Sequence, residues 1–208
     1  MKRNDIIAAG ISAAEELVES LPKDTMPHQK EHTATTVVRF GNAWYELNKY
    51  LDDEYRVAEL ESCTHVQPTT NDEMIICGPI DFYSLCPHHL LPVVGKAWIG
   101  YVPNQLCIGL SKMPRLVRLL AARPIIQEDL CTQIGHTLET RIFELPLFSN
   151  PDVPFGVMVV LKALHFCMLV RGVRVNNNCE VTTSYVSGCF KNPSKQARTE
   201  FMNLARII

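Results

Sequence analysis

Two short stretches that combine cysteine and histidine constrain the fold of this chain more than any other feature. The first, Ser84–Leu90, places Cys86 and His89 at Cys-x-x-His spacing, with His88 between them. The second is His165-Phe166-Cys167. A thiolate and an imidazole at this spacing suit a single zinc ion. If both stretches bind the same ion, the fold must bring them together; the alternative is a buried cysteine beside two polar histidines in a turn.

The composition is that of an ordinary globular protein of 208 residues, with 47% hydrophobic and 20% charged side chains. The length suits one domain, or one domain with a small appendage. A formal net charge of -2 provides no basic field for nucleic acid, and no apolar run is long enough to span a bilayer. Because the N-terminus shows no secretory signal, we expect a soluble cytoplasmic protein with its eight cysteines reduced, partnered by neither nucleic acid nor membrane.

The hydrophobic pattern predicts an α+β protein with an antiparallel sheet. Strand-like runs flank the first Cys/His stretch, so a hairpin is expected around residues 84–92. The second helix is expected to have Val38, Ala43, Trp44, Leu47 and Leu51 on its inner side, and residues 55–72 are expected to be irregular. The expected helices are 3–21, 33–51, one from Ser111 to a break at Arg123-Pro124, 127–145 and 193–206; the expected strands are 74–83, 93–102, 157–164 and 181–186; loops are expected at 23–32 and 150–154.

The Cys/His stretches also indicate chemistry. Ligation by Cys86, His89 and Cys167 would leave the fourth position of a tetrahedral zinc open, which is typical of a catalytic site where bound water has a pKa of roughly 7. His88 and His165 neighbour these ligands, and imidazole transfers protons near neutral pH. We expect His165 and Cys167 on one face of the same apolar strand, because they are two residues apart. The alternative for His165 is a histidine that only packs against its neighbours.

A group of basic residues provides candidates for binding an anion. Ser111, Lys112 and Arg115 come at the start of a predicted helix, where backbone N–H groups and positive side chains suit a phosphate. Arg171 follows the second Cys/His stretch, and Arg39 lies in the N-terminal region. We expect these residues to gather near the Cys/His stretches. The alternatives are an ordinary helix with Ser111 as its N-cap and arginines that are simply solvated.

Several separated motifs, in order along the chain, resemble those of GTP cyclohydrolase I. They are Thr36–Arg39, Ser84–His89, Val94–Lys96, Ile99–Pro103, Gly109–Arg115, Arg123–Glu128, His165–Met168, Arg171-Gly172, Thr182-Thr183 and Gly188–Phe190. The resemblance implies a tunnelling fold (T-fold), with an antiparallel sheet and helices on one side, over residues 56–208, and an N-terminal helical appendage over residues 1–55. It also implies a homodecamer of two face-to-face pentamers, with active sites between subunits.

The same resemblance implies a role for each candidate residue. It implies that Cys86, His89 and Cys167 bind zinc and that His88 and His165 are the acid/base catalysts. It implies that the triphosphate is bound by Ser111, Lys112, Arg115 and Arg171, and that guanine is bound by Glu128 with Gln127 beside it. Arg39 is implied to be contributed by a neighbouring subunit. From the residues alone, Glu128 is better explained as a helix cap. Two positions depart from the family pattern: Pro87 replaces the usual Glu, and Val37 replaces Pro in a Thr-Pro-x-Arg element.

We therefore expect a zinc-dependent GTP cyclohydrolase I, which hydrolyses GTP to formate and 7,8-dihydroneopterin triphosphate. Two alternatives stay open. Pro87 removes a carboxylate and a backbone N–H beside the metal stretch, which favours a related enzyme that stops at a formamidopyrimidine or uses another purine nucleotide. The other alternative is a zinc-binding assembly protein without catalytic activity.

Overall fold

The computed structural model of the chain describes residues 1–20, 30–63, 65–142, 155–176, 178–192 and 196–207. It divides into two compact units, Met1–Ala58 and Glu59–Ile208. Of the expected loop over 23–32, residues 23–29 lie outside the described residues, and residues 30–32 are helical instead, because α2 begins at Lys30. The linker at 150–154 and the helix ends at 143–145 and 193–195 also lie outside the described residues. Within the described part, no helix combines the length and apolar character needed to cross a bilayer.

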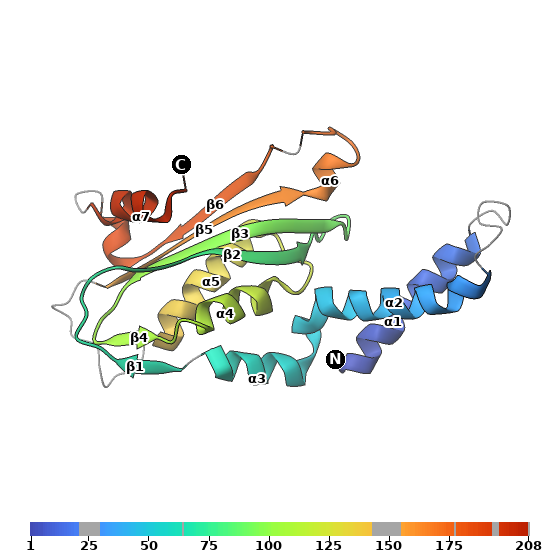
Figure 1. Cartoon of the computed structure of the whole chain (residues 1–208), viewed down its shortest axis with the longest axis horizontal. Helices are drawn as coiled ribbons and strands as arrows, with labels where there is room; N and C mark the ends of the chain where they lie inside the picture. Colours follow the sequence, from blue (N-terminus) through green and yellow to red (C-terminus); the bar gives the residue numbers. More distant parts are fainter. Residues whose placement is uncertain (21–29, 64, 143–154, 177, 193–195, 208) are drawn as a thin grey trace. The chain divides into compact units, whose positions relative to one another are not determined.

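A four-stranded antiparallel sheet forms the centre of the second unit (Figure 1). Its spatial order is β2 (Ile75–Leu85), β3 (Pro92–Val102), β5 (Gly156–His165) and β6 (Val181–Val186). β2 and β3 form the expected hairpin, which closes where Leu85 lies opposite Pro92. The predicted antiparallel α+β class is therefore confirmed, and the turn of this hairpin carries the first Cys/His stretch.

Two helices cover one face of this sheet, α4 (Lys112–Ala121) and α5 (Gln127–Ile142) (Figure 1). Ile99, Val159 and Tyr185 are neighbours across β3, β5 and β6, so their side chains share a face. The Tyr185 hydroxyl donates to the Glu139 carboxylate of α5, which places α5 on that face. The predicted apolar side of α4 is buried as expected, and so are the predicted α5 residues whose side chains the structure describes: Leu116, Val117, Leu119, Leu120, Leu130, Ile134 and Leu138.

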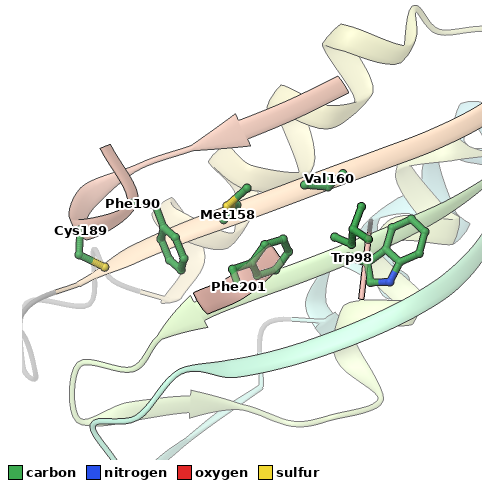
Figure 2. Packing of buried hydrophobic residues seen from close by; sticks show 7 residues of the cluster. Trp98, Met158, Val160, Cys189, Phe190 and Phe201 are labelled. Carbon is green, nitrogen blue, oxygen red and sulfur yellow. The ribbon is translucent and has the colours of Figure 1, made fainter. Parts of the chain in front are cut away.

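The C-terminal helix α7 (Ala197–Ala205) packs on the opposite face of the sheet (Figure 2). Its Phe201 is completely buried against Gly100 of β3, where a Cβ atom would overlap the aromatic ring. The expectation that helices lie on one side of the sheet is therefore wrong for α7. The apolar cluster on this face consists of Trp98, Met158, Val160, Cys189, Phe190, Phe201 and Ile207.

Residues 55–72, expected to be irregular, contain a helix and a strand. Helix α3 (Asp53–Cys63) begins after Asp52, whose Oδ1 accepts a hydrogen bond from the backbone N–H of Tyr55 at 3.3 Å. This is the usual way an aspartate caps a helix N-terminus, and it was not recognised in the sequence. Strand β1 (Val66–Pro68) pairs antiparallel with β4 (Leu106–Ile108) in a second, two-stranded sheet.

The first unit is built from α1 (Arg3–Ser20) and α2 (Lys30–Asn48), followed by a 3-10 turn at Lys49–Leu51. The two helices approach closely at Gly10, where a Cβ atom would lie 2.8 Å from the Trp44 Cβ. Within residues 35–48 of α2, the part whose side chains the structure describes, the buried residues are Val37, Gly41, Tyr45 and Asn48. The predicted inner residues Val38 and Ala43 are exposed instead. Because α1 packs closely on Gly41, the side of α2 that contains Gly41 faces α1.

Candidate metal centre and active site

The first Cys/His stretch folds into a tight turn at the end of β2. The carbonyl oxygen of Cys86 accepts hydrogen bonds from the backbone N–H groups of His89 at 3.3 Å and Leu90 at 2.8 Å. The N–H of Cys86 donates to the Leu91 carbonyl at 2.9 Å, which closes the turn. Pro87 occupies its second position, where a fixed φ is favourable and no backbone N–H is needed. The departure at Pro87 is therefore compatible with the turn that presents the two histidines.

Three side chains from the two Cys/His stretches meet at this turn. The ligand atoms of Cys86, His89 and Cys167 all lie within 4.8 Å of one another. Cys86 Sγ is 3.5 Å from Nδ1 of His89 and 3.8 Å from Nδ1 of His88, so His88 borders the trio. Cys167 lies in the one-turn helix α6 (Phe166–Leu169), because β5 ends at His165. The expectation that His165 and Cys167 lie on one strand is therefore wrong, although both residues reach the site.

The trio fits a zinc ion by its donor chemistry. Two sulfurs and one imidazole nitrogen are ligands that zinc prefers, and three protein ligands leave a further position open. Burial raises the pKa of the Cys167 thiol, and the adjacent Cys86 raises it further. A divalent cation would reverse this effect, because it stabilises thiolates. The trio can therefore hold a metal ion whose binding releases protons.

His165 is anchored beside the trio by the amide of Gln127. Its Nε2 lies 2.8 Å from Oε1 of Gln127, the first residue of α5. Burial lowers the pKa of His165, and the negative charge of Glu128 partly opposes that effect. The imidazole is therefore held at a defined place and favours its neutral form.

Glu128 and Arg171 are the two charged candidates at this end of the sheet. Glu128 lies in the first turn of α5 and is exposed, yet close enough to His165 to raise its pKa. Arg171 is exposed beyond α6, and its positive charge opposes the rise in the pKa of Cys167. Both side chains are free to meet a ligand that approaches the metal trio.

The other basic candidates lie at the opposite end of the sheet. Ser111 occupies the N-cap position of α4, as predicted, but its side chain makes no capping hydrogen bond. Lys112 is half-buried, and Arg115 is half-exposed with its Nη1 3.8 Å from Oε2 of Glu59. Figure 1 shows β4, which leads into α4, at one end of the sheet and α6 at the other.

The strand register gives the scale of this separation. Ile108 of β4 donates its backbone N–H to the Tyr101 hydroxyl at 3.1 Å, whereas His165 lies opposite Val93. Along β3, Val93 and Tyr101 are about 26 Å apart. Within one chain the strand that leads into α4 therefore contacts the far end of β3, and the role of these basic residues at the Cys/His stretches stays a prediction.

Arg39 lies on α2 in the first unit, where its side chain is exposed. Nothing in that unit identifies a ligand for it, so its role in substrate binding stays a prediction.

Two contacts of the candidate residues were not indicated by the sequence, although Thr183 belongs to one of the family motifs. Glu59 pairs with Arg115, and Thr183 accepts a hydrogen bond from the amide of Gln127 at 3.2 Å. Both contacts join residues more than 50 positions apart, so no local spacing could have indicated them.

The fold and the Cys/His/Cys trio define an α+β protein with a candidate metal centre beside a half-buried histidine. The family model for GTP cyclohydrolase I matches residues 11–206, and the chain belongs to that family.

Curated relatives named GTP cyclohydrolase 1 support this assignment. A Porphyromonas gingivalis relative is 43% identical over 132 residues, which cover 64% of this chain and 62% of the relative. A Sulfurihydrogenibium relative is 37% identical over 175 residues, 84% of this chain and 83% of the relative. A Methylococcus capsulatus relative is 39% identical over 171 residues, 82% and 81% of the two chains. The chain thus matches less than two thirds of the Porphyromonas protein's length and most of the other two.

Proposed function

We propose that this protein is a zinc-dependent GTP cyclohydrolase I that converts GTP to formate and 7,8-dihydroneopterin triphosphate. The observation that carries the proposal is the meeting of Cys86, His89 and Cys167 beside an anchored His165. That arrangement occurs in a chain of the GTP cyclohydrolase I family. The proposed setting is the cytoplasm, where thiols stay reduced.

Each residue of this end of the sheet has a part in the proposed reaction. Zinc held by the trio would supply Lewis acidity, which makes a water a stronger nucleophile near neutral pH. His165 gives a proton to the imidazole ring of guanine, so that water adds at C8 and the ring opens. A second hydrolysis releases formate, and His88 assists the later proton transfers. Glu128 accepts the N1–H and the exocyclic amine of guanine, and Arg171 binds phosphate oxygens.

The complete site is proposed to form between copies of the chain. Ser111, Lys112 and Arg115 are the proposed triphosphate set, and they follow β4, whose Ile108 contacts Tyr101, a residue about 26 Å along β3 from Val93, the register partner of His165. A guanine at the trio of one copy can reach this set only if another copy supplies it. This requirement supports the proposed ring-shaped assembly of two pentamers, in which Arg39 also comes from a neighbour.

The product test decides between this function and its alternatives. Zinc-loaded protein incubated with GTP should release formate and, after oxidation, a fluorescent pterin. Consumption of GTP without formate or pterin would favour an enzyme that stops at the formamidopyrimidine, the alternative that Pro87 raised. Unconsumed GTP would favour an enzyme for another purine nucleotide or a non-catalytic zinc protein.

His165→Ala is the matched variant for this test. Because His165 is outside the trio, the variant should keep its zinc while turnover falls on the order of 10²-fold or more. An active His165→Ala protein would contradict the proton-transfer role and leave only a packing role for this residue.

A further inference from the structure

Gln127 is a buried amide whose nitrogen and oxygen are both engaged inside the protein. Its side chain is only 4% exposed. Nε2 lies 2.9 Å from the carbonyl oxygen of Val181, 3.2 Å from Oγ1 of Thr183 and 3.4 Å from the carbonyl oxygen of Leu161. On its other side, Oε1 lies 2.8 Å from Nε2 of His165. Both polar atoms of this amide are therefore already bound inside the protein.

These partners determine which way the amide points. The carbonyl oxygens of Val181 and Leu161 can only accept hydrogen bonds, so the group that faces them must be the NH₂ of Gln127. The opposite orientation would bring three oxygens together in a buried place without a proton between them, which is unfavourable. Oε1 of Gln127 therefore faces His165, and an amide oxygen can only accept.

The orientation of the amide in turn determines the tautomer of His165. Because Oε1 of Gln127 accepts, Nε2 of His165 must carry the hydrogen that is donated to it. In the neutral imidazole the lone pair then lies on Nδ1. Without such a partner, both tautomers of a neutral histidine are accessible, and the lone pair has no fixed place.

We propose that Gln127 is a positioning residue that fixes His165 as the Nε2–H tautomer and leaves Nδ1 as the atom that exchanges protons. The catalytic part of this inference rests on the proposed function; the tautomer does not. In the proposed reaction Nδ1 first takes up a proton from water. The Nδ1–H bond then breaks, the proton passes to N7 of guanine, and the electron pair stays on Nδ1. The ring returns to the Nε2–H form, still bound to Gln127. Gln127 thus acts through His165, not by binding guanine.

The same contacts tie His165 to three elements. Gln127 begins α5, Leu161 lies in β5, and Val181 and Thr183 lie in β6. The amide therefore joins the start of the helix to both strands at the place where β5 delivers the histidine. Loss of the amide should change where the ring points without removing any zinc ligand.

The tautomer can be measured directly in the zinc-loaded protein. Solid-state NMR of protein labelled with ¹⁵N-histidine at about pH 8 would report the two ring nitrogens of neutral histidines. The signal of His165 is identified by its absence in His165→Gln. We expect a protonated Nε2 and an unprotonated Nδ1. A protonated Nδ1 in the unmodified protein would overturn the proposal, and this measurement needs neither GTP turnover nor a Gln127 variant.

A pair of glutamine variants tests the consequence for catalysis. Gln127→Met keeps the length of the side chain but removes the acceptor, so kcat should fall roughly 10–100-fold, as for other orienting partners, while the KM for GTP changes little. Its His165 signal should move away from the pure Nε2–H pattern. Gln133→Met is the control, because Gln133 lies on the same helix and accepts from Arg123 instead.

The outcomes separate this inference from the proposed function. Equal kcat values for Gln127→Met and Gln133→Met would overturn the positioning role. A Gln127→Met protein whose KM rises while kcat is kept would also overturn it, since that result indicates direct substrate binding. If the unmodified protein turns over no GTP, the proposed function fails, whereas the tautomer of His165 still stands or falls by its NMR signal.

Discussion

At the scale of single residues, the candidate centre depends on a few side chains whose neighbours set their properties. Cys86 is buried in the turn, while His89 is exposed and Cys167 is only partly buried, so the trio opens to one side. An open trio suits a metal ion that must also meet a substrate. Each member should therefore be indispensable for metal binding.

Cys167→Ala should lose the zinc. Two remaining donors cannot hold the ion in an open site, so metal content should fall from about one zinc per chain to nearly none. Elemental analysis of the purified protein measures this. Cys179→Ala, which removes an exposed cysteine outside the trio, should keep the metal. Full zinc occupancy in Cys167→Ala would show that the ligand assignment is wrong.

Glu128 and Asp129 form a matched pair for testing base selection. Both are exposed acids in the first turn of α5. A negative charge there stabilises a helix by about 0.3–1 kcal/mol, through its interaction with the helix dipole. Glu128→Ala should impair GTP turnover strongly, because guanine loses the acceptor for two N–H groups. Asp129→Ala should leave turnover unchanged, with a similar small loss of stability.

Thermal melting and GTP turnover, measured on both proteins, decide the role of Glu128. If Glu128→Ala melts lower and still turns over GTP like Asp129→Ala, the residue is only part of the helix start. The preference for GTP over ATP would then need another explanation.

At the scale of elements, α7 packs on the sheet through one buried side chain that fits a glycine of β3. Phe201 is fully buried over Gly100, whereas Leu204 on the same helix is 61% exposed. The glycine provides the space and the phenylalanine fills it, so helix and strand are matched in shape. Burial of Phe201 should supply much of the energy that holds α7 on this face.

Phe201→Ala should destabilise the protein by about 3–5 kcal/mol, as expected for an aromatic ring lost from a packed core. Leu204→Ala should change stability by less than about 0.5 kcal/mol, because its side chain is mostly in water. Urea unfolding of both variants measures the difference. Equal stabilities would mean that α7 does not pack as described.

At the scale of the whole molecule, the two groups of candidate residues occupy opposite ends of one sheet. The metal trio lies where β2 and β5 end, and the basic set lies where β4 leads into α4. In the proposed function, the two groups therefore act on one nucleotide from different copies of the chain. Association with another copy is the simplest way to join them.

Mixing two inactive variants should restore activity. Cys167→Ala lacks the trio but keeps the basic set, and a double variant, Lys112→Ala with Arg115→Ala, has the opposite defect. In oligomers formed by co-expression of both, about a quarter of the sites should combine two intact halves, so turnover should return to about a quarter of normal.

The control for this experiment mixes two proteins with the same defect. Cys167→Ala and Cys86→Ala both lack the trio, so no combination of these chains produces an intact site. Activity in this mixture, or none in the first one, would contradict a site shared between copies.

The sequence by itself determined the parts that depend on local spacing. Residue periodicity predicted the strands of the hairpin and the apolar sides of α4 and α5. The Cys-x-x-His stretch is a motif whose residues lie within a few positions of one another. The antiparallel α+β class follows from the order of these elements. The resemblance of several motifs indicated the family, which the comparisons confirm.

Only the tertiary structure decided how distant parts meet. It placed Cys167 on a one-turn helix, buried Val37 in place of Val38, and packed α7 on the second face of the sheet. It also joined Gln127 to His165 and placed Lys112 far from the metal trio. These features depend on packing and hydrogen bonds between residues far apart in the chain. Such contacts form only when the whole sheet is assembled, so local sequence spacing does not carry them.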